Sequence, residues 1–474
     1  MKKFLLFLAI LSTLATALTL ASCAPHVHTL SNPQKENEVA PSCKLEGSYE
    51  EVIYCTECSA ELSRKTKKTA RINHNFVDHA CTMCSIRDDE SSDGLKFVLN
   101  TDGESYSLDG IGTCTDNEIL VTTYNGLPVT QVLYGALEGC RNIKKVTLPE
   151  TVHTIESYAF RDCSSLESIN IPAAVTVINY EAFKNCSALK SIELPEAVYE
   201  IAGSAFRGCA SLANVTFSDN LRVINLFAFM DCDSFTNIVI PKNVTYVGDG
   251  AFSACDSLET IEFSEGVSII GEASFKGCPA LKEIDLPNSI SKISKDAFSQ
   301  CTALETVLMQ NNVTHIGSQA FYGCSSLSSI TLSNTLERMD NDVFTCCTSL
   351  TEIDLPNSLT NIGNYVFSYC SALTEMLLPD SLSIVGTDTF NGCSALKKVT
   401  FGTGLSFLGA RTFLGCDSLE EVIFEDTRDW YVCEDATYTN PSPVDKDTFK
   451  NPSDTALKYM MNMYSEKYLK KGTS

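Results

Sequence analysis

Hydrophobic positions between residues 137 and 424 recur with one fixed period. Thirteen cysteines, from Cys140 to Cys416, follow one another at steps of 23 residues. Phenylalanine stands three residues before each cysteine except the first, where Leu137 takes its place. Large apolar residues also stand three, six and eight residues after each cysteine. Such a period predicts a solenoid, in which every unit buries its apolar face against its neighbours.

One unit shows which elements the pattern predicts. Residues 168–171 read SINI and alternate, which predicts a short strand with Ile169 and Ile171 pointing inward. Pro172 ends this strand, because proline cannot continue a ladder. Residues 180–186 read YEAFKNC and have helix-like apolar spacing, which predicts a short helical turn. We therefore expect a repeat solenoid with short parallel strands on its concave face and short helical turns on its convex face.

The repeated cysteines share their phase with phenylalanine and leucine positions, which predicts buried, reduced thiols. Neighbouring strands lie about 4.8 Å apart, within the Cα range of disulfides, so distance alone does not exclude pairing. Parallel side chains do not converge, however, and thirteen is an odd number. No histidine shares the period, which argues against a ladder of metal ions. The expected thiol column consists of Cys163, Cys186, Cys209, Cys232, Cys255, Cys278, Cys301, Cys324, Cys347, Cys370, Cys393 and Cys416.

The repeated unit, LxxIxLPxxVxxIgxxAFxxC, resembles the BspA-like leucine-rich repeat of bacterial surface proteins. The resemblance covers roughly residues 130–424 and recurs thirteen times, although several units lack the proline. It implies an α/β-type leucine-rich-repeat solenoid that recognises or adheres to a ligand at the cell surface.

The segments on either side of the array are expected to cap it. Residues 94–136 resemble the cap that precedes such arrays, and repeats follow over 137–424. Residues 425–474 are expected to form a C-terminal cap with a helical tail, because a terminal repeat needs a polar outer cover. The apolar face of this tail consists of Leu457, Met460, Met461, Tyr464 and Tyr468.

The N-terminus predicts export. Residues 1–22 combine two lysines, an apolar run and small residues, as a signal peptide does. The sequence LASC, ending at Cys23, resembles a bacterial lipobox, which implies lipidation of Cys23 and an anchor at the cell surface. The alternative is an ordinary signal peptide that happens to end in cysteine. If Cys23 is lipidated, residues 23–40 would link the lipid anchor to the next module.

Residues 41–88 form a cysteine-rich, zinc-ribbon-like module. Its two CxxC pairs, Cys55 with Cys58 and Cys81 with Cys84, have the spacing of a closed tetrahedral site for one structural Zn²⁺ ion. Disulfides and free thiols remain open alternatives, because an exported protein meets an oxidising compartment.

The net charge of the chain limits the classes of partner that it can bind. The chain carries −24, which disfavours nucleic acid and anionic membranes, so membrane contact is expected through the lipid anchor alone. The chain shows no phosphate loop, nucleophile elbow, HExxH or dinucleotide motif, and no enzyme is predicted.

The outward face of the alternating strands is the predicted ligand surface, for an extracellular protein or glycan. A passive spacer or surface coat is one alternative. Glycan capture is another, or a carbohydrate-active enzyme that uses a carboxylate pair. The predicted ligand-binding residues, assigned to the concave face, are Glu193, Glu262, Glu283, Asp285, Leu308, Glu352 and Asp354.

Overall fold

The computed structural model describes residues 31–39, 47–54, 61–69, 76–77, 80–81, 91–434, 441–445 and 447–472. The chain divides into two compact units, residues 1–89 and residues 90–474. The second unit contains the repeats and is a solenoid of parallel strands. Within the described ranges, no helix has the length and apolar character needed to cross a bilayer.

The first unit contains a small antiparallel sheet. Its strands are β1 (Gln34–Val39), β2 (Gly47–Tyr54) and β3 (Glu61–Thr69), in the order β1-β2-β3. Arg64 on β3 forms ion pairs with glutamates of all three strands, which ties the sheet together. A short hairpin follows, formed by β4 (Phe76–Val77) and β5 (Ala80–Cys81).

Each coil of the solenoid has three sides. One side is a two-residue strand that follows the usual proline position, and these strands form the inner sheet. Eleven coil strands pair in parallel without interruption, and three strands of the C-terminal cap extend the same sheet. The eleven are β14 (Val177–Ile178), β16 (Glu200–Ile201), β18 (Val223–Ile224), β20 (Tyr246–Val247), β22 (Ile269–Ile270), β24 (Lys292–Ile293), β26 (His315–Ile316), β28 (Arg338–Met339), β29 (Asn361–Ile362), β31 (Ile384–Val385) and β33 (Phe407–Leu408).

A second side carries the strands predicted from the alternating pattern, which we call the outer strands. They form four separate parallel pieces, interrupted between β13 and β15, between β17 and β19, and again at residues 351–356. The outer strands are β8 (Glu118–Leu120), β11 (Lys145–Thr147), β13 (Ser168–Ile169), β15 (Ser191–Glu193), β17 (Asn214–Thr216), β19 (Asn237–Ile240), β21 (Thr260–Phe263), β23 (Glu283–Leu286), β25 (Thr306–Met309), β27 (Ser329–Thr331), β30 (Glu375–Leu378), β32 (Lys398–Phe401) and β34 (Glu421–Phe424).

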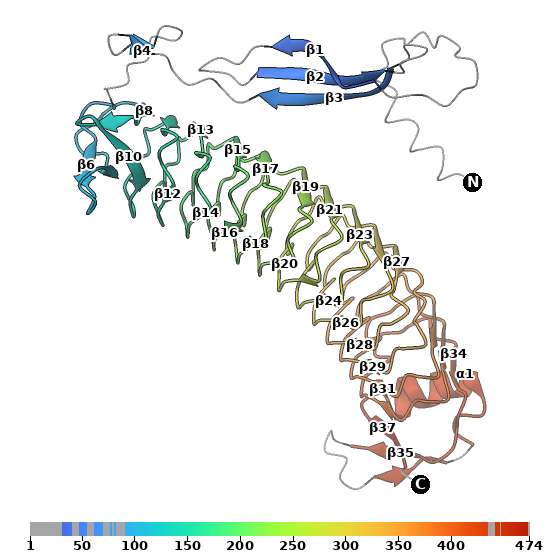
Figure 1. Ribbon diagram of the computed structural model, residues 1–474. Helices are drawn as coiled ribbons and strands as arrows, with labels where there is room; N and C mark the ends of the chain where they lie inside the picture. The colour runs from blue at the N-terminus through green and yellow to red at the C-terminus, as the bar shows by residue number, and fades with distance from the viewer. Residues whose placement is uncertain are drawn as a thin grey trace. The chain divides into compact units, whose positions relative to one another are not determined.

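The solenoid bends toward its inner sheet. Figure 1 shows the two-residue strands on the inside of the arc and the outer strands on its outside. Short parallel strands therefore line the concave face, but they are not the strands predicted from the alternation. The solenoid bends this way because its two hydrogen-bonded ladders differ. The unbroken inner sheet holds neighbouring coils at strand spacing, whereas the interrupted outer strands allow the coils to spread apart.

The third side, here called the turn side, consists of consecutive turns instead of the expected helical turn. Each coil has two residues with positive φ on this side, such as Tyr158 (φ 63°) and Asp162 (φ 60°). A left-handed residue cannot continue a right-handed helix. Amides in the turns alternate instead between the residue three back and the next coil, as when the Phe160 amide donates to the Ala182 carbonyl at 2.8 Å. The turn side is therefore a third hydrogen-bonded ladder.

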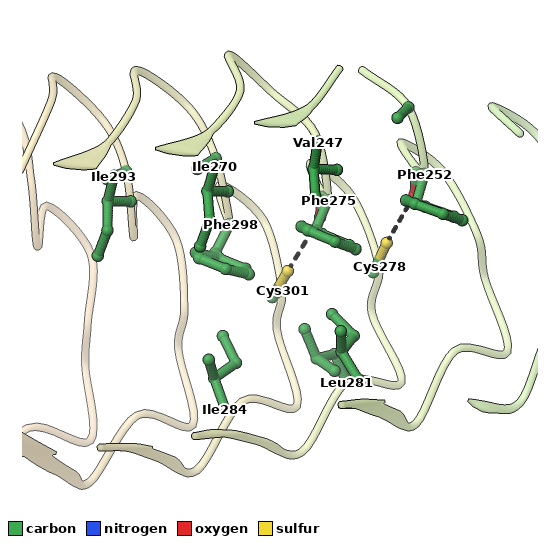
Figure 2. Packing of buried hydrophobic residues seen from close by; sticks show 14 of the residues in the cluster. Val247, Phe252, Ile270, Phe275, Cys278, Leu281, Ile284, Ile293, Phe298 and Cys301 are labelled. Atoms are coloured by element: carbon green, nitrogen blue, oxygen red, sulfur yellow. Dashed lines mark hydrogen bonds between the residues drawn. The ribbon is translucent and has the colours of Figure 1, made fainter. Parts of the chain in front are cut away.

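Apolar columns from all three sides meet in the centre of each coil. Figure 2 shows Val247 and Ile270 from the inner sheet, Ile284 from an outer strand, and Phe275 from the turn side. The phenylalanine rings stack from coil to coil with nearly parallel planes, at centroid distances from 5.2 Å at one end to 5.8 Å at the other. Because these columns run the length of the array, the coils share one continuous core.

Both ends of the array are covered. At the N-terminal end, β6 (Lys96–Leu99), β7 (Tyr106–Gly110) and β10 (Leu127–Val132) lead into β12 (Thr154–Ile155), and β9 (Thr123–Tyr124) pairs with β10. At the C-terminal end, β37 (Tyr468–Lys471) pairs antiparallel with both β33 and β35 (Trp430–Cys433), and β36 (Ser442–Pro443) completes that edge.

The C-terminal tail is only partly helical. Helix α1 (Pro452–Asp454) runs into a π-helix, Thr455–Met463, and Met460 is buried there. Tyr468 does not extend the helical face, because it lies in β37, where its backbone pairs with Cys433 and closes the sheet edge.

Candidate binding surface

Five of the seven predicted ligand residues lie on the outer strands and point to solvent. Glu283 and Asp285 alternate with buried Ile284 and Leu286 on β23, as the period-two pattern requires. Exposed Leu308 on β25 stands directly across the ladder from Asp285. Glu193 ends β15 and Glu262 lies on β21, both exposed. The assignment of these residues to the concave face is wrong, because Figure 1 shows their strands on the outside of the arc.

Glu352 and Asp354 lie where the outer strands are interrupted. They line a shallow depression of about 440 Å³ with Glu375, Leu377 and residues of β32. The structure thus brings two predicted carboxylates together with a third, but separates them from the pair on β23 by the two intervening coils. Leu377 is the most exposed leucine of the outer strands, at 67%.

A row of exposed and half-buried apolar side chains follows the corner between the inner sheet and the turn side. It begins with Tyr134, which is 68% exposed, and continues on successive coils with Tyr158 and Tyr180. The three rings meet edge to face, with centroids 4.9 Å apart in the first pair and 5.6 Å apart in the second. Such contacts fix the orientation of rings that solvent would otherwise leave free to rotate.

Glycines let the row continue across the next coils. A Cβ atom at Gly203 would lie 3.0 Å from the Leu226 side chain and 3.4 Å from the Tyr180 ring, so these two side chains close over the missing one. The Phe227 ring covers Gly250 in the same way. We call Tyr134, Tyr158, Tyr180, Leu226 and Phe227 the aromatic ridge.

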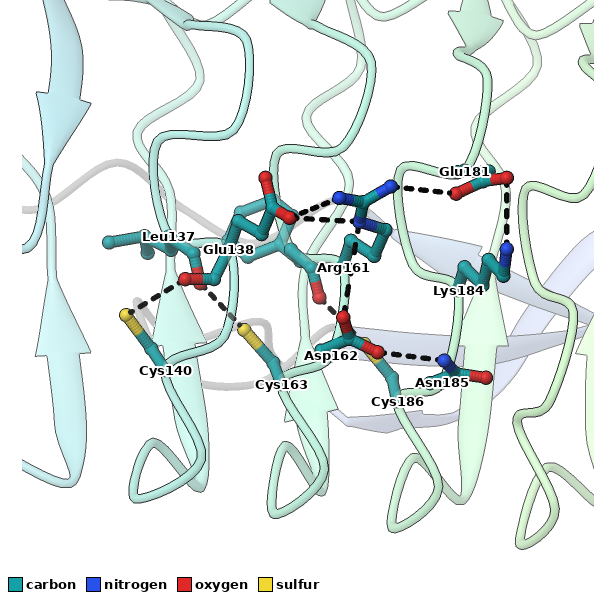
Figure 3. Close-up of polar contacts among 11 residues, drawn as sticks. Leu137, Glu138, Cys140, Arg161, Asp162, Cys163, Glu181, Lys184, Asn185 and Cys186 are labelled. Atoms are coloured by element: carbon teal, nitrogen blue, oxygen red, sulfur yellow. Dashed lines mark hydrogen bonds and ion pairs between the residues drawn. The ribbon is translucent and has the colours of Figure 1, made fainter.

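Arg161 holds the centre of the ridge in place. Its guanidinium lies 4.3 Å from the centroid of the Tyr158 ring, and it hydrogen-bonds to Glu138 and Glu181 (Figure 3). Lys184 donates to the other carboxylate oxygen of Glu181 at 3.0 Å. Burial raises the pKa of Glu181, but hydrogen bonds from Lys184, Arg161 and Tyr180 outweigh it and lower that pKa overall. The buried carboxylate is therefore ionised and fully engaged.

The carboxylate of Glu181 raises the pKa of two phenolic groups of the ridge. The hydrogen bond to Glu181 raises the pKa of Tyr180, and burial followed by the charge of Glu181 raises the pKa of Tyr158. Both phenols are thus neutral hydrogen-bond donors over the physiological range. The ridge presents apolar ring faces whose polar ends are already oriented.

From Cys163 onward, the periodic cysteines of the array point inward, each thiol toward the preceding coil. Cys186 donates from Sγ to the Phe160 carbonyl at 3.1 Å, and Cys163 donates to the Leu137 carbonyl at 3.0 Å. The cysteines from Cys114 to Cys416 are free thiols, and Cys163 is completely buried. Burial raises the pKa of Cys163 to about 12, so this thiol is not a nucleophile at neutral pH.

The predicted lipidation and zinc positions fall outside the described residues. This applies to Cys23, Cys55, Cys58 and Cys84, whereas Cys81 is described only as a backbone position in β5. Among the described residues, no group of three or more His, Cys, Asp or Glu side chains is arranged to hold a metal ion. Zinc binding and lipidation therefore stay predictions.

Sequence reasoning missed the aromatic ridge, although a signal for it was present. Consider the positions five to ten residues before each cysteine of the array. The six coils from Cys140 to Cys255 have six aromatic residues at these positions, whereas the seven later coils have two. The two are Tyr365 and Phe407. Comparing coils column by column, instead of seeking what every coil shares, reveals this concentration.

The family model described as BspA type leucine rich repeat region (6 copies) matches residues 127–234, 222–350 and 314–432. Together these matches cover well over half of the chain. The chain belongs to the BspA-type leucine-rich repeat family. The family matches begin at β10 in the N-terminal cap and end within β35, so the BspA-type repeats account for the whole array and for both of its junctions with the caps.

Several solved structures of bacterial proteins resemble the chain. A leucine-rich repeat protein from Bacteroides ovatus is 28% identical, with 70% of this chain and 93% of that chain covered and a TM-score of 0.49. A leucine rich cell surface protein from Faecalibacterium prausnitzii is 24% identical, with 71% and 94% covered and a TM-score of 0.42. The pneumococcal vaccine antigen PcpA is 22% identical, with 70% and 86% covered and a TM-score of 0.41. Comparison with curated proteins finds no match.

Proposed function

We propose that this protein is a cell-surface recognition protein that binds a protein or glycan ligand through the concave side of its repeat array. Its anchor would be a lipid on Cys23, and the cysteine-rich module would separate the anchor from the array. The observation that supports binding most strongly is the aromatic ridge. Its three tyrosines contact one another on successive coils, and Leu226 and Phe227 extend the row two coils beyond Tyr180. Such a row of accessible apolar side chains is uncommon on a surface without a partner.

The composition of the ridge agrees with binding. Tyrosine and arginine are enriched among the residues that contribute most to binding energy at protein interfaces. Rigid aromatic side chains also lose little conformational entropy when a ligand covers them. The ridge supplies both, since Arg161 fixes Tyr158 from one side and neighbouring tyrosines fix it from two others.

The test is a binding screen on the mature chain with Cys23→Ser, immobilised by its N-terminus. The screen presents matrix proteins, cell-wall polymers and glycans to three forms of the protein. One is unchanged, one carries Tyr134→Ala and Tyr180→Ala, and one carries Glu262→Lys and Asp285→Lys on the outer strands. We expect saturable binding that the tyrosine variant loses at least tenfold and the outer variant keeps.

Each other result has a definite meaning. Loss of binding in the outer variant alone would move the ligand surface to β21 and β23. Failure of every ligand class to bind would favour the passive spacer, in which the array only separates its ends.

A further inference from the structure

We infer that the aromatic ridge binds an extended, arginine- and lysine-rich segment of a partner protein. This inference rests on the proposed function and names the class of partner. It combines three observations: how the ridge already accommodates guanidinium groups, how charge is distributed along the concave side, and how long the ridge is.

The ridge holds two guanidinium groups of its own chain, and both contacts have the same chemistry. Arg161 lies over the Tyr158 ring and hydrogen-bonds to Glu138 and Glu181. Arg207 lies 5.8 Å from the Phe227 ring centroid and hydrogen-bonds to Asp231 at 3.4 Å. In both places an aromatic face and a carboxylate together receive a cation, an arrangement in which the ring quadrupole and the carboxylate act in the same direction.

Ring faces and carboxylates remain available beside these pairs. Tyr134 and Tyr180 are exposed, and Tyr199 at the other edge of the inner sheet is 43% exposed. Glu156 directly follows β12, and Glu200 lies on β16 in the same stretch of the concave side, both partly accessible. A second guanidinium or an ammonium group would find here the combination that Arg161 already uses.

Acidic residues outnumber basic ones along the concave side, most clearly at the ridge. At the positions five to ten residues before the cysteine, the coils from Cys140 to Cys255 have four acidic residues and one basic residue. The seven later coils have six acidic and four basic residues at the same positions. A basic segment would therefore be attracted to this side of the array, and most strongly to the ridge coils.

The dimensions fit an extended chain. The ridge spans four coil-to-coil steps of about 4.8 Å, or roughly 19 Å. An extended peptide advances about 3.3 Å per residue, so about six residues would cover the ridge. An acidic polymer would meet the same carboxylates with the wrong sign, and a small metabolite would prefer an enclosed pocket.

The experiment measures binding of two fluorescent peptides by anisotropy, at low and at high salt. One repeats Arg-Gly-Ser and the other repeats Glu-Gly-Ser, and a neutral polysaccharide serves as competitor. We expect the arginine peptide to bind, the glutamate peptide not to bind, and high salt to weaken binding at least tenfold. Tyr134→Ala combined with Tyr180→Ala should weaken binding tenfold or more, while Tyr134→Phe keeps it.

The matched control is Tyr369→Ala, which removes a tyrosine that is 54% exposed on the turn side of a distant coil. It should bind the arginine peptide as the unchanged protein does, and circular dichroism should show the same fold for all variants. Equal binding of the glutamate peptide, full displacement by the neutral polysaccharide, or equal loss in Tyr369→Ala would overturn the inference.

The screen described under Proposed function separates two kinds of failure. If the arginine peptide does not bind but the screen finds a ligand that requires Tyr134 and Tyr180, the partner class is wrong and the recognition function stands. If neither assay finds binding, both proposals fail.

Discussion

The thiol of Cys186 donates a hydrogen bond to the carbonyl oxygen of Phe160 in the preceding coil, at 3.1 Å. The same bond, always to the residue 26 positions earlier, recurs in every coil from Cys163 to Cys416. Cysteine is small enough for this crowded column and supplies a weak donor that alanine lacks. The periodic cysteine is thus an element of the architecture, placed between a stacked phenylalanine column and a carbonyl that accepts a second hydrogen bond from the thiol.

The first prediction concerns thiol reactivity. At pH 8 the buried thiols of the array should not react with a thiol reagent within minutes, because they are protonated and shielded from solvent. Partly accessible Cys346 should react, and all thiols should react in denaturant. Mass spectrometry of the labelled peptides measures this. Rapid labelling of Cys186 in the native protein would contradict the buried column.

The second prediction concerns alkaline pH. Thiols of the unfolded chain lose their protons near pH 9, whereas burial raises the pKa of Cys209 and Cys324 to about 12. Between these values the unfolded state binds fewer protons than the native state, so stability falls as pH rises through this window. Each buried thiol contributes about 1.4 kcal/mol per pH unit there. Urea midpoints should therefore drop steeply above pH 9. A flat profile from pH 8 to 11 would show that the thiols are not protonated and buried.

The third prediction concerns the phenylalanine column. Phe298→Ala should lower the free energy of unfolding by about 3–5 kcal/mol, because Phe298 is fully buried and stacks on Phe275 and Phe321. The control, Leu308→Ala at an exposed position of β25, should change it by less than about 0.5 kcal/mol. Urea unfolding followed by circular dichroism gives both values. Similar losses in the two variants would mean that the core is not organised around this column.

The fourth prediction concerns the C-terminal cap. Hydrogen bonds from Arg428 and Lys471 lower the pKa of Asp426, and the Asp426 carbonyl accepts the indole N–H of Trp430 at 3.0 Å. A lowered carboxyl pKa stabilises the cap above the ordinary range near pH 4, and this stability is lost as the pH falls further. Asp426→Asn should cost the cap about 1–2 kcal/mol at neutral pH.

Trp430 is the only tryptophan, so its fluorescence measures this effect locally. In Asp426→Asn the emission of Trp430 should change at lower urea than in the unchanged protein, ahead of the circular dichroism signal. Exposed Asp417→Asn in the last coil is the control and should leave both transitions in place. Coincident transitions in every form would mean that the cap unfolds only with the array.

The repeated features of the fold could be predicted from the sequence, and the unique ones could not. Ile284 and Val247 point inward because a strict period fixes which face of each segment is buried. The prediction of a helical turn was wrong because residues such as Tyr158 adopt positive φ. Hydrogen bonds to the next coil compensate for that conformation. Such compensation comes from neighbouring coils and is invisible within one unit.

The direction of curvature was misjudged for a related reason. It depends on which ladder remains continuous, and the break at residues 351–356 has no clear mark in the pattern, since Ile353 and Leu355 keep the period. The aromatic ridge was missed because Tyr134, Tyr158 and Tyr180 do not occupy one repeat position. Relative to the cysteine of its coil, the position of the tyrosine differs by one residue between adjacent coils. A search for one strict period therefore does not detect the row.

Strand β37 closes the last coil by running antiparallel to β33. An open parallel edge would invite the first coil of another molecule to continue the stack, since one coil offers the next much the same ladder. Reversing the direction of the final strand removes that match. Even when crowded together, such molecules can stand side by side without polymerising into fibres, and each array keeps the length that its own thirteen units specify.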